Sequence, residues 1–152
     1  MSIVCSGSVA YDYLMSFPGY FREHILPDRL ESISLSFLVD NMVRQRGGTA
    51  PNIAYTLALL GERPQVLATV GEDFGEYRAW LESKGVDTAL TKVIPGTYTA
   101  SFFANTDRAN NQICSFYTGA MAHAATLSLR DLPAAPDLVI IGAEVQTTEG
   151  EF

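Results

Sequence analysis

The sequence predicts an α/β fold with a largely parallel sheet. Strand-like apolar runs alternate with segments of helical periodicity, and the run Leu138–Ile141 is apolar without interruption, as in strands covered on both faces. A third observation predicts a second, smaller group of strands. In the segments 32–39, 97–104 and 112–117, apolar residues alternate with hydroxyl-bearing residues. This alternation favours an antiparallel patch with one solvent-exposed face, which could form a lid over a pocket.

Strands are predicted wherever a short apolar or alternating run ends at turn-forming residues. In chain order, these runs are 3–5, 11–17, 32–39, 65–70, 88–94, 97–104, 112–117 and 138–141. Within 32–39, the apolar side chains at 33, 35, 37 and 39 alternate with three serines, so this strand should have one apolar and one hydroxyl face. The extended run continues to Arg46, and Gly47-Gly48 ends it.

Two longer helices and a short one are predicted between these strands. The first begins near Pro51, which suits the first helical turn, and ends before Gly61, which suits the position after the last turn. The second lies between residues 72 and 85, because acidic residues near its start and Lys84 at its end match the direction of the helix dipole. Its apolar stripe comprises Phe74, Tyr77 and Leu81. The short helix falls near 128–132.

The composition narrows the class of function. The chain has 152 residues, enough for one domain with a sizeable core, and its 17 acidic and 10 basic residues give a formal net charge of −7. Without a basic run, such a chain is a poor candidate for binding nucleic acid or an anionic membrane. The longest uncharged stretch, Ala109–Leu129, is too polar to span a membrane, and no basic residue of a secretory leader precedes Arg22. We therefore expect a cytoplasmic protein.

No metal site is predicted from the cysteines and histidines. Cys5 and Cys114 match no metal or redox spacing and are expected to be free, buried thiols. His24 and His123 have no ligand partners at metal-binding spacing.

The run Gly47–Ala54 is the most informative motif. Two glycines before a helix let a backbone approach a ligand closely, and the start of the helix offers free N–H groups. Asn52 presents a donor and an acceptor on one amide, which matches two neighbouring hydroxyls of a sugar. Asp12 follows the first strand, at the end where α/β sheets bind ligands, and its carboxylate suits the same diol. An ordinary loop-to-helix turn and a solvated turn aspartate are the alternative interpretations.

The spacing of these residues resembles a known signature. Gly-Gly-x-Ala-x-Asn-x-Ala, followed by Gly61 and Gly71, is similar to the first signature of the ribokinase-like (PfkB) carbohydrate and nucleoside kinases. Further motifs resemble the bacterial adenosine kinases of this family, in the same order along the chain up to about Ala143. They are Ser6-Gly7-Ser8, Asp12, Phe17-Pro18-Gly19, 34–40, Asp73-Phe74, Tyr77-Arg78, Trp80-Leu81, 115–117, 119–121 and 138–143.

The resemblance implies a fold and a position within it. The fold is a three-layer α/β structure with a mostly parallel sheet and a small antiparallel lid, whose strands fall roughly within 11–46 and 97–117. Family members are about twice as long, and their second signature, Asp-Thr-x-Gly-x-Gly-Asp, is not found here. We therefore expect residues 1–152 to be the N-terminal half of one kinase domain, without the C-terminal half that carries the catalytic aspartate and the ATP site.

The resemblance also implies which residues bind the acceptor. They are Ser8, Asp12, Ser36, Gly48, Asn52, Phe102, Phe116 and Met121. Asp12 would hold the ribose 2′,3′-diol, and Ser8 and Ser36 would add hydroxyl contacts. Phe102 and Phe116 would sandwich a purine, with Met121 as an adaptable apolar wall. By composition alone, these two phenylalanines are equally well explained as core residues.

The implied activity is transfer of the γ-phosphoryl group of ATP, with Mg²⁺, to the 5′-hydroxyl of adenosine. This chain would supply the acceptor site, be inactive alone and form a homodimer through its lid strands. Two alternatives stay open: a sugar kinase of the same family, and a non-catalytic ligand-binding or oligomerisation fragment. The two lid phenylalanines favour a purine over a bare sugar without deciding between them.

Overall fold

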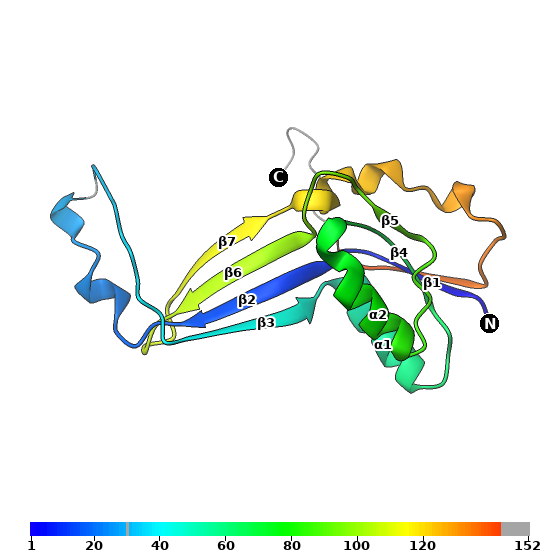
Figure 1. Cartoon of the computed structure of the whole chain (residues 1–152), viewed down its shortest axis with the longest axis horizontal. Helices are drawn as coiled ribbons and strands as arrows, with labels where there is room; N and C mark the ends of the chain where they lie inside the picture. Colours follow the sequence, from blue (N-terminus) through cyan, green and yellow to red (C-terminus); the bar gives the residue numbers. More distant parts are fainter. Residues whose placement is uncertain (30, 144–152) are drawn as a thin grey trace.

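The computed structural model describes residues 1–29 and 31–143, whose strands form two four-stranded sheets (Figure 1). The first sheet is parallel throughout, in the order β5-β4-β1-β8. Its strands are β1 (Ile3–Ser6), β4 (Gln65–Val70), β5 (Thr91–Val93) and β8 (Leu138–Ile141). The second sheet is mixed, in the order β3-β2-β6-β7, and is called the lid below. Its strands are β2 (Ala10–Ser16), β3 (Asn41–Gly47), β6 (Ala100–Thr106) and β7 (Gln112–Tyr117).

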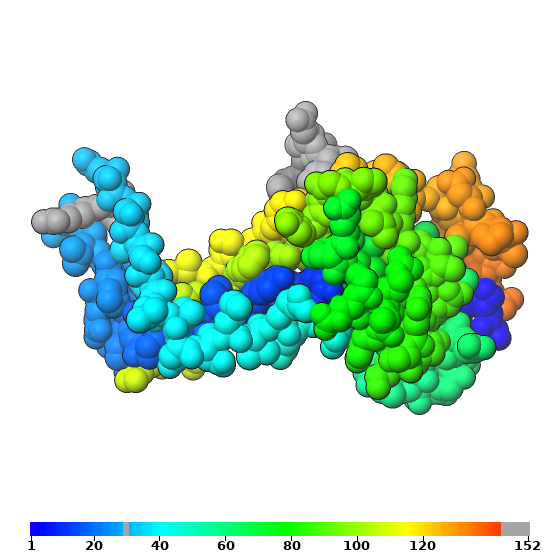
Figure 2. Space-filling view, in the orientation of Figure 1, coloured from blue at the N-terminus to red at the C-terminus, as the bar shows by residue number. Residues whose placement is uncertain are grey.

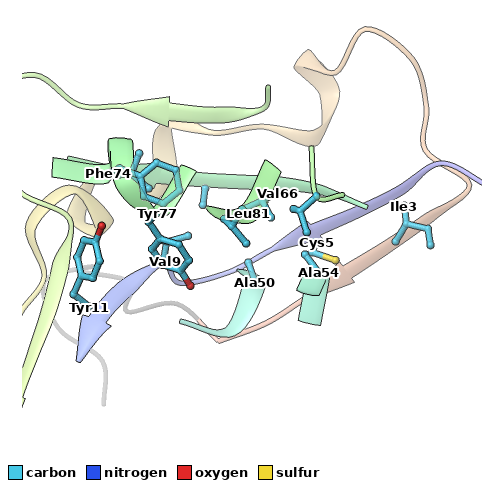
Figure 3. Close-up of a cluster of buried hydrophobic side chains, with 13 residues drawn as sticks. Ile3, Cys5, Val9, Tyr11, Ala50, Ala54, Val66, Phe74, Tyr77 and Leu81 are labelled. Atoms are coloured by element: carbon cyan, nitrogen blue, oxygen red, sulfur yellow. The ribbon is translucent and has the colours of Figure 1, made fainter. Parts of the chain in front are cut away.

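The core lies between the parallel sheet and two helices, α1 (Thr49–Leu59) and α2 (Gly75–Ser83). Alternate residues of β1 and β4 point towards the helices and are fully buried with Ala50, Ala54, Tyr77 and Leu81 (Figure 3). The alanines of α1 allow its backbone to approach the sheet closely, whereas α2 fills the remaining space with large side chains. The predicted α/β class is therefore confirmed.

Short 3₁₀ helices complete the described part of the chain. They are η1 (Phe21–Glu23), η2 (Pro27–Arg29), η3 (Glu72–Phe74), η4 (Gly119–Thr126) and η5 (Leu129–Asp131). The last of these occupies the place predicted for the short helix near 128–132. The strand expected at 88–94 is shorter in the structure, where β5 spans Thr91–Val93. The strand expected at 97–104 begins and ends later, as β6 at Ala100–Thr106.

The lid continues directly from the parallel sheet and extends away from the helices (Figures 1 and 2). Strand β1 leads into β2 after only three residues, and β2 pairs with β3 on one side and β6 on the other. The predicted lid is present with antiparallel pairs β2–β3 and β6–β7, whereas its central pair, β2–β6, is parallel, so the sheet is mixed. Both edges of the lid, β3 and β7, are exposed along most of their length.

Residues 32–39 do not form the predicted strand. Strand β3 instead occupies Asn41–Gly47 and pairs with β2 over its whole length. The preceding segment therefore passes beyond the end of β2, where it pairs with no strand of residues 1–29 and 31–143. Phe37 packs there against Phe17 and Phe21, at ring-centroid distances of 5.0 and 4.8 Å, while Leu38 is 87% exposed.

A buried carboxylate ties η1 to the far end of the lid. Asp107, after β6, accepts hydrogen bonds from the backbone N–H groups of Phe21, Ala109 and Asn111, at 3.0, 2.8 and 2.9 Å. Burial raises the pKa of Asp107, but these bonds and the Asn111 amide favour the ionised form and lower that pKa to about 2. The ionised side chain therefore joins the β6–β7 turn to η1.

Burial bears on two further expectations. The run Leu138–Ile141 has the pattern of a strand covered on both faces, whereas in β8 Leu138 is 40% and Ile141 74% exposed, and β8 lies at the edge of the sheet formed by the described residues. Cys114 is exposed on β7, whereas Cys5 is buried as expected.

Candidate functional site

A pocket of about 460 Å³ lies where the lid meets the start of α1. It is lined by Ser8, Ala10, Asp12, Gly48, Thr49, Asn52, Phe102, Phe116, Met121 and Ala143. The pocket therefore brings together seven of the eight residues that the sequence analysis singled out. The exception is Ser36, which is exposed in the segment between η2 and β3 and does not line the pocket.

Three of these residues form a row across the lid. Asp12 on β2 is the register partner of Phe102 on β6, and Phe102 is the partner of Phe116 on β7. Register partners on neighbouring strands share one face of a sheet, so a carboxylate and two aromatic rings are presented to the same side. Phe116 is 46% exposed, so its ring keeps a free surface for a ligand.

Asp12 is a half-buried carboxylate within β2, not a residue of a solvated turn. Burial raises the pKa of Asp12, and no described residue donates a hydrogen bond that would offset this cost. Gly47 lies directly against it: a Cβ atom built at Gly47 would fall 2.5 Å from the Asp12 Oδ2 atom. The carboxylate is thus held in a defined place with its accepting capacity unused, as a site for ligand hydroxyls requires.

The start of α1 forms the opposite wall. Gly48 has φ 101°, a conformation that favours glycine, and a Cβ there would overlap the Ser8 carbonyl oxygen. The Thr49 N–H donates to the Ser8 Oγ at 3.0 Å and the Ala50 N–H to the Ser8 carbonyl oxygen at 3.2 Å, whereas Pro51 has no N–H. Ser8 therefore takes up the N–H groups of Thr49 and Ala50, two of the groups expected to be free at this helix start.

The polar side chain left free on this wall is Asn52. Its amide is exposed on the first turn of α1 and makes no hydrogen bond to a described residue, so a donor and an acceptor both remain available to a ligand. Asn52 and Asp12 thus approach the pocket from different elements, the helix and the lid.

Three lining residues, Ala10, Thr49 and Ala143, were not predicted. The Thr49 hydroxyl lies 3.2 Å from the Ser8 Oγ and donates to the Ala143 carbonyl oxygen at 3.1 Å, which joins α1 to the segments after β1 and β8. Thr49 stands inside the glycine motif, so its position was a usable signal. Ala10 packs with Ala100 and Met121 at the base of the lid, a contact that no local pattern indicates.

Comparison with known proteins assigns the chain to a family. The model of the pfkB family of carbohydrate kinases matches residues 9–149. The chain belongs to this family. It is 32% identical over 120 residues to a nucleoside kinase of Methanothermobacter thermautotrophicus, an alignment that covers 78% of this chain and 36% of that protein. The sequence-based recognition of the PfkB family is thereby confirmed.

Solved structures agree on the fold. The ligand-free nucleoside kinase of Burkholderia thailandensis is 40% identical, with a TM-score of 0.80, over 94% of this chain and 47% of that one. Its complex with inosine gives 38% identity and a TM-score of 0.74, over 94% and 45%. The pfkB chain described here thus spans less than half the length of these relatives.

No helix in residues 1–29 and 31–143 has the length and apolar character needed to cross a membrane. Within the same residues, no group of three or more His, Cys, Asp or Glu side chains is placed to hold a metal ion.

Proposed function

We propose that this chain is the acceptor-binding part of a cytoplasmic, ATP-dependent nucleoside kinase whose acceptor is adenosine. The observation that carries the proposal is the row of Asp12, Phe102 and Phe116 on the lid, facing Asn52 on α1. The B. thailandensis relative, whose structure was solved with inosine, supports a nucleoside as the acceptor class.

The two ends of the pocket differ in chemistry, as a nucleoside does. Asp12 and Asn52 offer acceptors and a donor for the ribose 2′,3′-diol, and Thr49 lies beside them. Phe102, Phe116 and the buried Met121 form an apolar end for the base, where aromatic stacking contributes about 1–3 kcal/mol per base. A free sugar would leave this end uncovered, which is why adenosine is preferred over the alternative of a sugar acceptor.

The contribution of this chain to catalysis is positioning. Phosphoryl transfer depends mainly on the placement of the acceptor and on stabilisation of charge, and an oriented 5′-hydroxyl provides the first of these. The residues of the pocket act here on the acceptor alone, whereas the catalytic base and the groups that hold ATP and Mg²⁺ are expected outside this chain. We propose that the chain alone is inactive and that the longer family architecture supplies these groups.

Calorimetry with the purified chain tests the proposal. Adenosine should bind, ribose should bind at least tenfold more weakly, and Asp12→Asn should weaken adenosine binding, since each lost hydrogen bond to a charged group costs about 1.5–3 kcal/mol. Asp40→Asn, a change of the same type away from the pocket, is the matched control. Equal affinity for ribose and adenosine would instead favour the sugar kinase, and binding of neither would favour the non-catalytic fragment.

We also propose a homodimer through the lid strands. The edge strand β3 exposes Met42 and Val43, at 61% and 41%, and β7 exposes Ile113 at 41%. Such edges recruit further strands unless they are covered. Light scattering should give a dimer for the parent chain and a monomer for Val43→Lys, whereas a monomeric parent chain would contradict this part of the proposal.

A further inference from the structure

The lid is attached to the core on the face opposite the pocket. Side chains alternate along β2 and β3, so Tyr11, Arg44 and Arg46 lie on the face opposite to Asp12 and meet the segment Gly71–Tyr77. This segment, called the seat below, comprises η3 and the start of α2. It makes contacts to β2 and β3 and to the residue that precedes β6, whereas it does not line the pocket.

Glu76 is the centre of the exposed part of this attachment. Its carboxylate accepts from Arg44 at 2.7 Å and from Arg46 at 3.3 Å, two residues apart on β3. The Arg44 guanidinium also lies 4.9 Å from the centre of the Tyr11 ring, and that of Arg46 lies 4.9 Å from the centre of the Trp80 ring. One carboxylate therefore orients two cations that are themselves packed on aromatic rings.

The buried part of the attachment uses hydrogen bonds. The Tyr77 hydroxyl donates to the Gly47 carbonyl oxygen at 3.1 Å, and burial raises the pKa of Tyr77, which keeps this donor protonated. Asp73 Oδ1 accepts from the Thr99 N–H at 2.8 Å and from the Thr99 hydroxyl at 2.7 Å, directly before β6. The Tyr11 hydroxyl donates to the Asp73 carbonyl oxygen at 3.3 Å.

These contacts lead straight to the pocket residues. Arg44 and Arg46 flank Gln45, which is the register partner of Asp12, and Gly47 at the end of β3 lies against the Asp12 carboxylate. Thr99 is three residues from Phe102 on the same extended segment. A movement of the lid on its seat would therefore move Asp12 and Phe102 relative to Asn52, which belongs to α1 in the core.

We propose that Glu76 is a positioning residue: it holds the lid at the angle at which Asp12 and Phe102 face Asn52, and it does so without touching the ligand. The buried hydrogen bonds of Tyr77 and Asp73 fix the point of attachment, whereas the ion pairs of Glu76 limit rotation about it. The part of this inference that concerns nucleoside affinity rests on the proposed function; the part that concerns the lid does not.

The chain carries its own reporters of lid position. Trp80 on α2 is the single tryptophan, and Cys114 on β7 is exposed, whereas Cys5 is buried with a raised pKa, which protects it from labelling. Energy transfer from Trp80 to an acceptor dye on Cys114 therefore measures the distribution of core-to-lid distances without any ligand. Unlabelled protein corrects for changes in the emission of Trp80 itself.

The variant is Glu76→Gln, and the control is Glu62→Gln, which makes the same change in a side chain without ion pairs to described residues. We expect a broader distance distribution in Glu76→Gln alone. The double replacement of Arg44 and Arg46 by Gln should broaden it similarly, with no further effect when combined with Glu76→Gln. Because the pairs are partly exposed, with side chains 36–65% accessible, high salt should broaden the parent distribution towards that of the variant.

Calorimetry with adenosine completes the test. Glu76→Gln should raise the Kd about two- to fivefold at low salt, and the difference should vanish at high salt. An unchanged distance distribution would overturn the inference whatever adenosine does, and a broadened distribution with an unchanged Kd would overturn the positioning role. If the parent binds no adenosine while Glu76→Gln still broadens the distribution, the proposed function fails and the attachment of the lid by Glu76 stands.

Discussion

Gly47→Ala provides a sharp test of how the lid presents Asp12. A Cβ atom at Gly47 would lie 2.5 Å from Asp12 Oδ2, 2.9 Å from Cγ and 3.0 Å from Oδ1, whereas ordinary contact begins near 3.4 Å. The carboxylate must therefore move by about 1 Å, which lengthens hydrogen bonds of 2.7–3.0 Å beyond their useful range. Loss of even one such bond to a charged group costs about 1.5–3 kcal/mol, so we expect the Kd for adenosine to rise at least tenfold.

The matched control is Gly75→Ala. No heavy atom lies within 4 Å of a Cβ built at Gly75, and its φ and ψ of −55° and −45° are helical, so the added methyl group should leave binding unchanged and favour α2. Calorimetry with adenosine and thermal melting of both variants separate binding from stability. A Gly47→Ala protein that melts like the parent and binds adenosine within twofold of it would refute the reasoning.

Three further predictions concern ionisation and exposed surface. Because burial raises the pKa of Asp12 above the ordinary 3.8, adenosine binding should weaken as the pH falls through that raised pKa, and Asp12→Asn should abolish this dependence; a flat calorimetric profile in the parent would contradict it. The pKa of Asp107 is lowered from 3.8 to about 2, so its ionised form stabilises the fold above pH 3.8, and this contribution is lost as the pH falls towards 2. In urea unfolding, the stability of Asp107→Asn should therefore fall less than that of the parent over this pH range, and identical pH profiles would count against the prediction. Ile141 is 74% exposed on β8, so the chain should bind an apolar dye and melt broadly, and Ile141→Lys should lower the dye signal; a parent chain that binds no dye would show this strand to be covered.

Local patterns predicted much of the architecture. Pro51 and Gly61 bracketed a helix that the structure places at Thr49–Leu59, and the strand predicted at 65–70 coincides with β4. These elements follow from signals inside the segment itself, such as helix start and stop residues and apolar runs. The same signals were misleading at 32–39. An alternating segment becomes a strand only where a neighbouring strand has a free edge, and β3 already pairs with this edge of β2 over the whole length of β2.

By itself, the sequence determined the family, most of the elements and the residues expected to bind the acceptor, because a spaced motif and local periodicity can be recognised without knowing which segments meet. Only the tertiary structure decided how these residues stand together. Asp12, Phe102 and Phe116 are neighbours because β2, β6 and β7 pair in one register, and Ser36 is apart from them because its segment does not pair. Register and strand order depend on hydrogen bonds between segments that are distant in the sequence. The ion pairs of Glu76 with β3 likewise join distant segments, so no local pattern encodes either feature.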